Sequence, residues 1–304
     1  MTGTSALSVD DRARRHHSQT DGHDQTVLHL ARPLVRGEAR LRVAVRDGAT
    51  RLAELHQRDP LSLRLPAPAR GDIFEACVIT TSGGIVGGDR LALEVAADAG
   101  SRLRAYPQAA EKIYRSLGPE SRIDLRLSAG RGAWLEWLPQ ETILFEGARL
   151  RRESRLDLAA GARVMAGEML VFGRRASGES LTRGSVHDGW RVYEEGRLRW
   201  ADAFHLSGDL AAALASPACL GGCGAAASFI YAAPDAPARL EALRRLLPPD
   251  EADARQALSA VNGLIVGRFL GEARALRRAY GGFWAAARAV LAELPPQLPR
   301  LWHL

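Results

Sequence analysis

The sequence predicts a mainly β protein, built from stacked layers of β-strands in the manner of a β-helix, with two C-terminal α-helices packed on the strand body. Three observations lead to this fold class. Apolar and polar residues alternate with a period of two over much of residues 28–206, as they do in half-buried strands. A strand–turn–strand pattern recurs about every thirty residues within that region. Apolar residues at helical spacing follow after about residue 225.

The chain is expected to form one folded domain after a polar tail. Residues 1–24 are polar and have no periodic apolar pattern, so we expect them to be disordered. Residues 25–304 contain no linker-like stretch, which predicts a single β-rich domain with an α/β C-terminal part. Its first clear element is residues 41–55, where alternation on both sides of Asp47-Gly48 predicts a β-hairpin.

Three similar units follow the hairpin. Each has an alternating strand, a turn rich in alanine and glycine, and a second strand, and the turns contain Gly100, Gly130 and Gly161. The second strands of the first two units end in the same way, at Pro107-Gln108 and Pro139-Gln140. Because no segment of helical period separates the strands, the pattern favours stacked β layers over βαβ units.

The C-terminal part mixes strands and helices. Residues 235–247 have apolar residues at helical spacing and Pro237 near the start, which predicts a helix. Residues 259–270 are predicted to form a strand. Residues 272–294 are predicted to form a second helix, with a weak point at Gly281-Gly282.

A glycine-rich stretch, "TTSGGIVGGDRL" at residues 80–91, could suggest a phosphate-binding loop. Such a loop requires a following helix whose N-terminus faces the phosphate. Here the next residues alternate as a strand, and the loop contains no lysine. We therefore expect a turn between two strands, in which the glycines allow positive φ angles or a close backbone contact.

Composition and charge limit the classes of function. The net charge is +6, but arginines and acids are interspersed, which argues against a nucleic-acid partner and favours an acidic protein. No apolar run approaches the roughly 20 residues of a membrane span, and no signal-like stretch begins the chain, so we expect a cytoplasmic protein without a membrane partner. Cys77, Cys219 and Cys223 are expected to be reduced thiols.

Acidic residues lie among large apolar residues or glycines throughout the β region. Such acids usually face water or pair with arginine. A carboxylate that faces inward needs a partner, water or a cation. The acids in question are Asp89, Glu111, Glu136, Glu141, Glu146, Glu168, Glu179 and Asp202.

Five segments, taken in order, resemble a known family. They are "SGGIVGGDRL", "QAAEKIYRS", "WLPQETILFEGARLRR", "GEMLVFGRRASGE" and the closing "LPRLW". Together they resemble the UreD family of urease accessory proteins, also called UreH in some bacteria. The resemblance covers roughly residues 27–304.

The resemblance implies an accessory role and no enzymatic activity. Members of this family take part in placing nickel in apo-urease. They contact the urease subunits and recruit UreF, which brings the GTPase UreG, while the metallochaperone UreE acts upstream. A mostly β stack with two C-terminal helices is the fold that the resemblance implies, and a water-filled internal tunnel is the proposed nickel route.

Carried over by motif, the tunnel-lining positions correspond to Asp89, Glu111, Glu168 and Asp202. At Glu111 the family more often has a small hydroxyl residue. We expect these acids to contact nickel(II) in transit, with no tightly bound cofactor. Carboxylates and water hold nickel more loosely than imidazole or thiolate, and a conduit must release what it binds.

Two other functions remain open from the residues alone. A carboxylate pair on a stacked β fold could act as acid and base on a sugar or similar ligand, with the two acids about 5–10 Å apart in an open cleft. A nucleic-acid binder, the lesser alternative, would bind with a steep dependence on salt.

Overall fold

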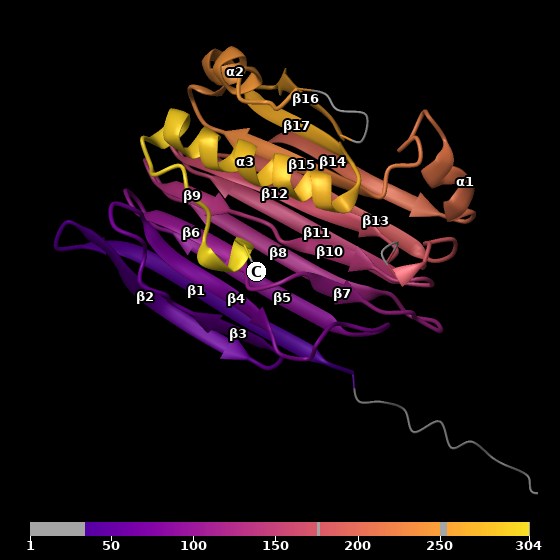
Figure 1. Ribbon diagram of the computed structural model, residues 1–304. Helices are drawn as coiled ribbons and strands as arrows, with labels where there is room; N and C mark the ends of the chain where they lie inside the picture. Colours follow the sequence, from indigo (N-terminus) through magenta and orange to yellow (C-terminus); the bar gives the residue numbers. More distant parts are fainter. Residues whose placement is uncertain (1–33, 175–176, 250–253, 304) are drawn as a thin grey trace, which may run out of the picture. The chain divides into compact units, whose positions relative to one another are not determined.

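Two β-sheets make up most of the computed structural model, which describes residues 34–174, 177–249 and 254–303 (Figure 1). The predicted polar tail, residues 1–24, lies outside these described residues. The seven-stranded sheet contains, in spatial order, β14 (Arg197–Ser207), β13 (Ser185–Glu194), β11 (Arg149–Leu158), β8 (Ser121–Ala129), β5 (Arg90–Ala97), β1 (Arg36–Arg46) and β2 (Ala49–Arg58).

The ten-stranded sheet lies against the first. Its main path is β16 (Ala254–Val261), β17 (Leu264–Gly271), β15 (Ala225–Ala232), β12 (Arg163–Phe172), β9 (Trp134–Trp137), β6 (Arg102–Pro107), β4 (Phe74–Thr80) and β3 (Leu61–Arg64). Two short strands lie off this path: β10 (Glu141–Leu144) pairs with β12 and with β7 (Glu111–Ile113). Leucine, isoleucine, valine and alanine side chains from both sheets form the core between them.

Between β4 and β12 the chain alternates from one sheet to the other, so that each coil lies beside the previous one. Strands β5, β8 and β11 pair in parallel in one sheet, and β4, β6, β9 and β12 do so in the other. This arrangement confirms the predicted stack of strand–turn–strand units. Gly100 and Gly161 have positive φ angles, whereas Gly130 is required because an added Cβ would lie 2.6 Å from the backbone nitrogen of Ala99.

The glycine-rich loop at residues 80–91 joins β4 to β5, as predicted, and the hairpin β1–β2 turns at Asp47-Gly48. The single strand predicted at residues 259–270 is wrong. The chain there forms β16 and β17, a hairpin that turns at Asn262-Gly263, where both residues have positive φ angles. Asn-Gly between two alternating segments is a strong hairpin signal that the sequence contained.

Helices α2 (Ala236–Arg244) and α3 (Ala273–Ala292) confirm the two predicted C-terminal helices, and α1 (Leu210–Ala215) is a short helix that was not predicted. Helix α3 crosses the outer face of the ten-stranded sheet (Figure 1). The ring of Phe229 on β15 contacts Phe283 and Trp284 edge to face, at centroid distances of 4.9 and 5.7 Å. No helix in the described parts of the chain combines the length and apolar character needed to cross a membrane.

Helix α3 runs unbroken through Gly281-Gly282, contrary to the predicted weak point. Gly281 is buried against the C-terminal segment, and a Cβ there would lie 2.6 Å from the Trp302 indole nitrogen. Trp302 belongs to the short 3₁₀ helix η2 (Arg300–His303). The glycine therefore allows a close contact between the helix and the end of the chain.

A buried ionic network joins α3 to the ten-stranded sheet. The Nε of Arg288 donates to both carboxylate oxygens of Glu136, at 2.9 and 2.8 Å, and its Nη2 donates to Asp72 at 2.5 Å. Arg104 on β6 also donates to Asp72, at 2.9 Å, and to Glu75. The side chains of Arg288, Glu136 and Asp72 are fully buried, so each of these charges depends on its partners.

Replacing Arg288 should destabilise the fold strongly. Arg288→Ala leaves the carboxylates of Asp72 and Glu136 buried with reduced compensation, and we expect it to lower the free energy of unfolding by about 3–5 kcal/mol. Urea unfolding would measure the change. The control is Arg155→Ala, which removes an exposed pair with Asp157 and should cost about 1 kcal/mol or less. Equal losses in the two variants would contradict the role assigned to the buried network.

Candidate functional site

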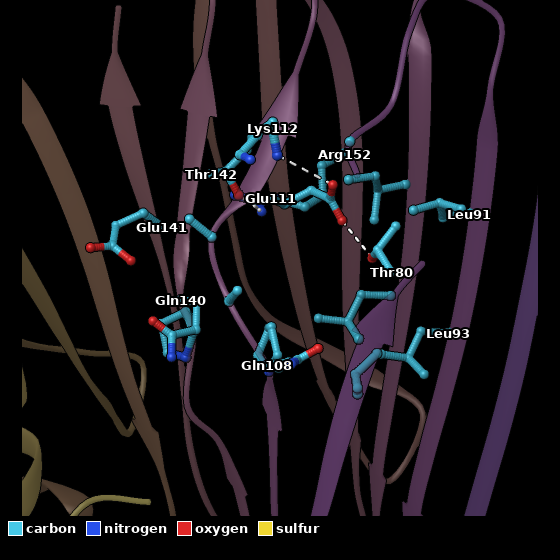
Figure 2. A pocket seen from close by; sticks show the side chains of 18 of the residues that line it. Thr80, Leu91, Leu93, Gln108, Glu111, Lys112, Gln140, Glu141, Thr142 and Arg152 are labelled. Carbon is cyan, nitrogen blue, oxygen red and sulfur yellow. Dashed lines mark hydrogen bonds between the residues drawn. The ribbon is translucent and has the colours of Figure 1, made fainter. Parts of the chain in front are cut away.

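A cavity of about 220 Å³ lies between the two sheets. Leu91 and Leu93 of β5 form part of its apolar wall, and Glu111 and Arg152 bring charges into it (Figure 2). The glycine-rich loop also reaches it through Gly84. A Cβ on Gly84 would lie 2.8 Å from the carbonyl oxygen of Lys112, so the close approach of this loop to β7 requires glycine.

The repeat itself explains why a cavity forms here. Strand β6 ends at Pro107, and β9 ends two residues before Pro139; both prolines line the cavity. Proline has no N–H for the ladder, so the sheet is interrupted at the same level in two successive coils. Ala105 of β6 pairs with Trp137 of β9, and Trp137 pairs with Ala166 of β12. Two residues further along each strand are Pro107, Pro139 and Glu168, so Glu168 lies at the level of the two prolines. Strand β12 continues through this level, so the Glu168 carboxylate lies where the ladder between the neighbouring strands is interrupted.

Glu111 lies on the short strand β7 at the cavity wall (Figure 2). One carboxylate oxygen accepts a hydrogen bond from the Thr80 hydroxyl at 2.6 Å, and the other accepts from the backbone N–H of Lys112 at 3.2 Å. Burial raises the pKa of the Glu111 carboxyl, although the bond from Thr80 acts in the opposite direction.

Glu168 shares a single guanidinium with Asp188. Arg152 donates from Nε and Nη2 to the two oxygens of Asp188, at 2.9 and 2.7 Å, and its Nη1 lies 2.7 Å from Glu168. The same Nη1 donates to the hydroxyl of Thr142 at 2.9 Å. Arg152, Glu168 and Asp188 are each at most 6% exposed, so one positive charge compensates two buried negative charges.

This imbalance determines the electrostatics of the site. Burial, together with the charge of Asp188, raises the pKa of the Glu168 carboxyl from about 4.5 to about 7, although Arg152 acts in the opposite direction. Burial opposes the charge on Arg152 itself, but Asp188 and Glu168 outweigh it and raise the pKa of the guanidinium. A pKa near 7 means that the Glu168 carboxyl gains and loses its proton near neutral pH.

The structure brings Glu111 and Glu168 of the four predicted residues to one cavity, and it places the other two elsewhere. Asp89 is buried at the end of the glycine-rich loop, where it accepts hydrogen bonds from the backbone N–H groups of Val35 and Val86, at 3.1 and 3.0 Å. Asp202 lies on the edge strand β14, is about 41% exposed and is ion-paired with Arg268. Across the described residues, no group of three or more histidine, cysteine or acidic side chains could hold a metal ion.

Sequence reasoning missed Arg152 and Asp188, although the strand pattern contained the signal. In β11, Arg152 has the same parity as Leu150 and Leu156, and alternation therefore places it on the inner face. Asp188 likewise shares the parity of Val186 in β13. A charged residue at an inward position of a strand is a candidate for a buried ionic site.

A second hollow, of about 670 Å³, lies on the opposite side of β4. Val78 and Thr80 line the first cavity, whereas Cys77 and Ile79 line the hollow, as alternation along a strand requires. Gln108, which follows the proline that ends β6, lines both spaces. Burial raises the pKa of the Cys77 thiol to about 11, so this thiol is protonated at neutral pH.

The pKa of Glu168 should be visible in the stability of the protein. Its carboxyl titrates at about 7 when folded, against an ordinary value of about 4.5. Between these values the folded state holds more protons, so the contribution of this group to the free energy of unfolding falls as the pH rises. We expect urea unfolding of the native protein, compared with Glu168→Gln, to show a loss on the order of 3 kcal/mol across this window. A difference between the two proteins that stays constant over this range would contradict the shifted pKa.

Comparison with known proteins gives a consistent result across the chain. A family model described as "UreD urease accessory protein" matches residues 35–303. The urease accessory protein UreD of Magnetococcus marinus is 43% identical over 274 residues, which cover 89% of this chain and 94% of that protein. The urease accessory protein UreD 1 of Methylobacterium radiotolerans is 44% identical over 272 residues, covering 88% and 91%. For UreD of Xanthobacter autotrophicus the identity is 43% over 267 residues, covering 88% and 89%.

The matched region begins one residue before β1 and ends at the last residue of η2, so it contains both sheets, the cavity and the C-terminal helices. The resemblance found in the sequence motifs is therefore confirmed. The chain belongs to the UreD family of urease accessory proteins.

Proposed function

We propose that this chain is a non-catalytic, cytoplasmic accessory protein that helps to install nickel in apo-urease. In this role it holds apo-urease together with UreF and the GTPase UreG, and UreE supplies nickel upstream. The observation that carries the proposal is the cavity between the sheets, which offers acidic side chains inside a protein whose relatives are named urease accessory proteins. Nickel(II) passes through as cargo and is not a resident cofactor.

Glu111 and Glu168 are the residues assigned to transit. Both line the cavity, and burial raises the pKa of each carboxyl. A divalent ion compensates the buried negative charge that otherwise disfavours ionisation. Carboxylate oxygens bind nickel less tightly than imidazole or thiolate does, which suits a path from which the ion must leave.

Arg152 is the competing cation in this cavity. Its Nε and Nη2 hold Asp188 in a two-point contact, while Nη1 alone contacts Glu168 and Thr142. Because Nη1 alone contacts Glu168, loss of that one contact would free Glu168 and keep the two-point pair with Asp188. An incoming ion therefore displaces one part of the arginine contact and does not have to break the whole ionic cluster.

The second hollow supplies a continuation of the path. Gln108, which follows the last residue of β6, lines both spaces, and its backbone N–H donates to the carbonyl oxygen of Val78 on β4 at 2.7 Å. The amide oxygen of Gln108 is a weak, neutral ligand that suits transfer between two spaces. On this basis the route runs between the sheets and crosses the ten-stranded sheet at the gap made by the repeated prolines.

Neutralising the cavity acids should slow nickel loading of urease without dissociating the complex with UreF and the urease subunits. We expect Glu111→Gln and Glu168→Gln each to lower the rate at which urease gains nickel by about tenfold, since the loss of groups around a metal site typically lowers affinity 10–100-fold. Nickel in purified urease would be measured by mass spectrometry. Co-purification with UreF and the urease subunits should remain unchanged.

Asp202→Asn is the matched control, because it also removes one carboxylate but lies in an exposed pair with Arg268. We expect full loading in this variant. Full loading in both cavity variants would reject a path through the cavity. A loss in Asp202→Asn equal to theirs would instead favour the wider set of tunnel residues that the sequence motifs indicate.

A further inference from the structure

The outer face of the seven-stranded sheet carries a row of arginines. Arg36 on β1 pairs in register with Arg90 on β5, which pairs with Arg122 on β8, which pairs with Arg151 on β11. Because the strands are parallel and in register, these four side chains project from the same face at the same level. Arg36, Arg90 and Arg122 are exposed, and Arg151 is about 36% exposed.

The row continues onto the last two strands of the sheet. Arg151 pairs in register with His187 on β13, and His187 pairs with His205 on β14. The two imidazole rings are 5.7 Å apart, and His187 lies 3.2 Å from Glu153. Every residue at this level of the six strands is thus basic.

Three of these charges have no counterion within the described structure. Arg151 contacts Glu120 and Glu153, at 3.2 and 3.4 Å, but no described acidic group lies within ion-pair distance of Arg36, Arg90 or Arg122. Like charges directly opposite each other on neighbouring strands destabilise a sheet. The row therefore costs stability in the isolated protein, and a bound row of anions would remove that cost.

The neighbouring level has the opposite sign. Two residues further along the strands lie Glu38, Asp124 and Glu153, with Ala92 between the first two. Glu38 and Glu153 are paired with arginines, whereas Asp124 has no ion-pair partner among the described residues. A uniformly anionic polymer such as a nucleic acid would meet the Asp124 carboxylate beside the row. The face also offers little for base stacking, because Tyr193 is covered by the guanidinium of Arg155 at 4.1 Å from the ring centroid. The alternation of charge fits a folded protein that carries a single acidic stripe.

The distance between neighbouring arginines indicates whether a β-strand or an α-helix would best present the matching acidic residues. Adjacent strands lie about 4.8 Å apart, so the arginines repeat at this interval across the sheet. Acidic residues on one face of a β-strand would repeat at about 6.8 Å, whereas side chains at i and i+3 or i+4 of an α-helix repeat at about 5–6 Å. The helical interval is the closer match over four arginines.

We propose that the row formed by Arg36, Arg90, Arg122 and Arg151 is a docking surface for an α-helix of a partner protein, which lies across the strands and presents a stripe of carboxylates. The long helix of this chain, α3, packs on the other sheet (Figure 1). The burial patterns of β1, β5 and β8 place the row on the outer face of its own sheet, away from the core between the sheets. This surface is separate from the cavity, and the inference does not depend on nickel transit.

The test uses the full chain and a designed helical peptide. The probe is a fluorescent alanine–glutamine peptide with glutamates at i, i+4, i+7 and i+11, and its control has the same composition with the glutamates distributed around the helix. We expect fluorescence anisotropy at low salt to show tighter binding of the striped peptide. Arg90→Ala combined with Arg122→Ala should weaken its binding about five- to tenfold, the effect of two exposed ion pairs, and should leave the unfolding temperature unchanged or raised.

Arg131→Ala combined with Arg197→Ala is the matched control, since it removes the same charge at exposed positions outside the row. It should leave peptide binding unchanged. Charge reversal at Arg90 and Arg122 to glutamate should transfer the preference to a lysine-striped peptide. Equal affinity for the striped and scrambled peptides, equal losses in the two double variants, or tighter binding of a single-stranded oligonucleotide would each overturn the proposal.

Discussion

The constraint on which the structure depends is the in-register parallel stacking of successive coils. Each coil places corresponding residues at the same level of both sheets, so any feature that repeats in the sequence becomes a continuous feature in space. Inward leucines such as Leu93 and Leu125 pair across β5 and β8 and form the core. The same rule aligns arginines on the outer face and aligns the prolines that interrupt the inner ladder. Core, cavity and basic row thus share one geometric origin.

Burial of charge is the second organising feature, and it occurs on both faces of the ten-stranded sheet. On the outer face, Arg104 and Arg288 bind Asp72, Glu75 and Glu136 beneath α3. Two guanidinium groups there meet three carboxylates. Inside the cavity one guanidinium meets two carboxylates. Surplus negative charge in the interior is costly unless a proton or another cation compensates it.

Sequence patterns were sufficient for the fold class, the repeat and the two C-terminal helices, because periodicity and turn residues are local signals. The family motifs, and not these local patterns, indicated Glu111 and Glu168, which line one cavity. They did not reveal that the Asp89 carboxylate accepts hydrogen bonds from the backbone N–H groups of Val35 and Val86. Val35 lies 54 residues before Asp89, so that contact leaves no local signal. Motif order likewise could not show that Asp202 would meet Arg268 at an exposed position, because β14 and β17 belong to different sheets. Arg152 is the instructive omission, because strand parity alone places it inside.

The end of the chain is held in place by the interior. Arg104 and Arg288 donate to the carbonyl oxygen of Gln297, Arg277 donates to that of Trp302, and the Trp302 ring stacks beneath Arg277 at 4.6 Å. Guanidinium groups that also neutralise buried carboxylates thus fasten this segment over the second hollow. Removing residues from this C-terminal segment, or attaching a tag to it, would loosen the lining of that hollow. It would also disturb the charge balance beneath α3. Affinity tags and fusion partners are therefore poorly placed there.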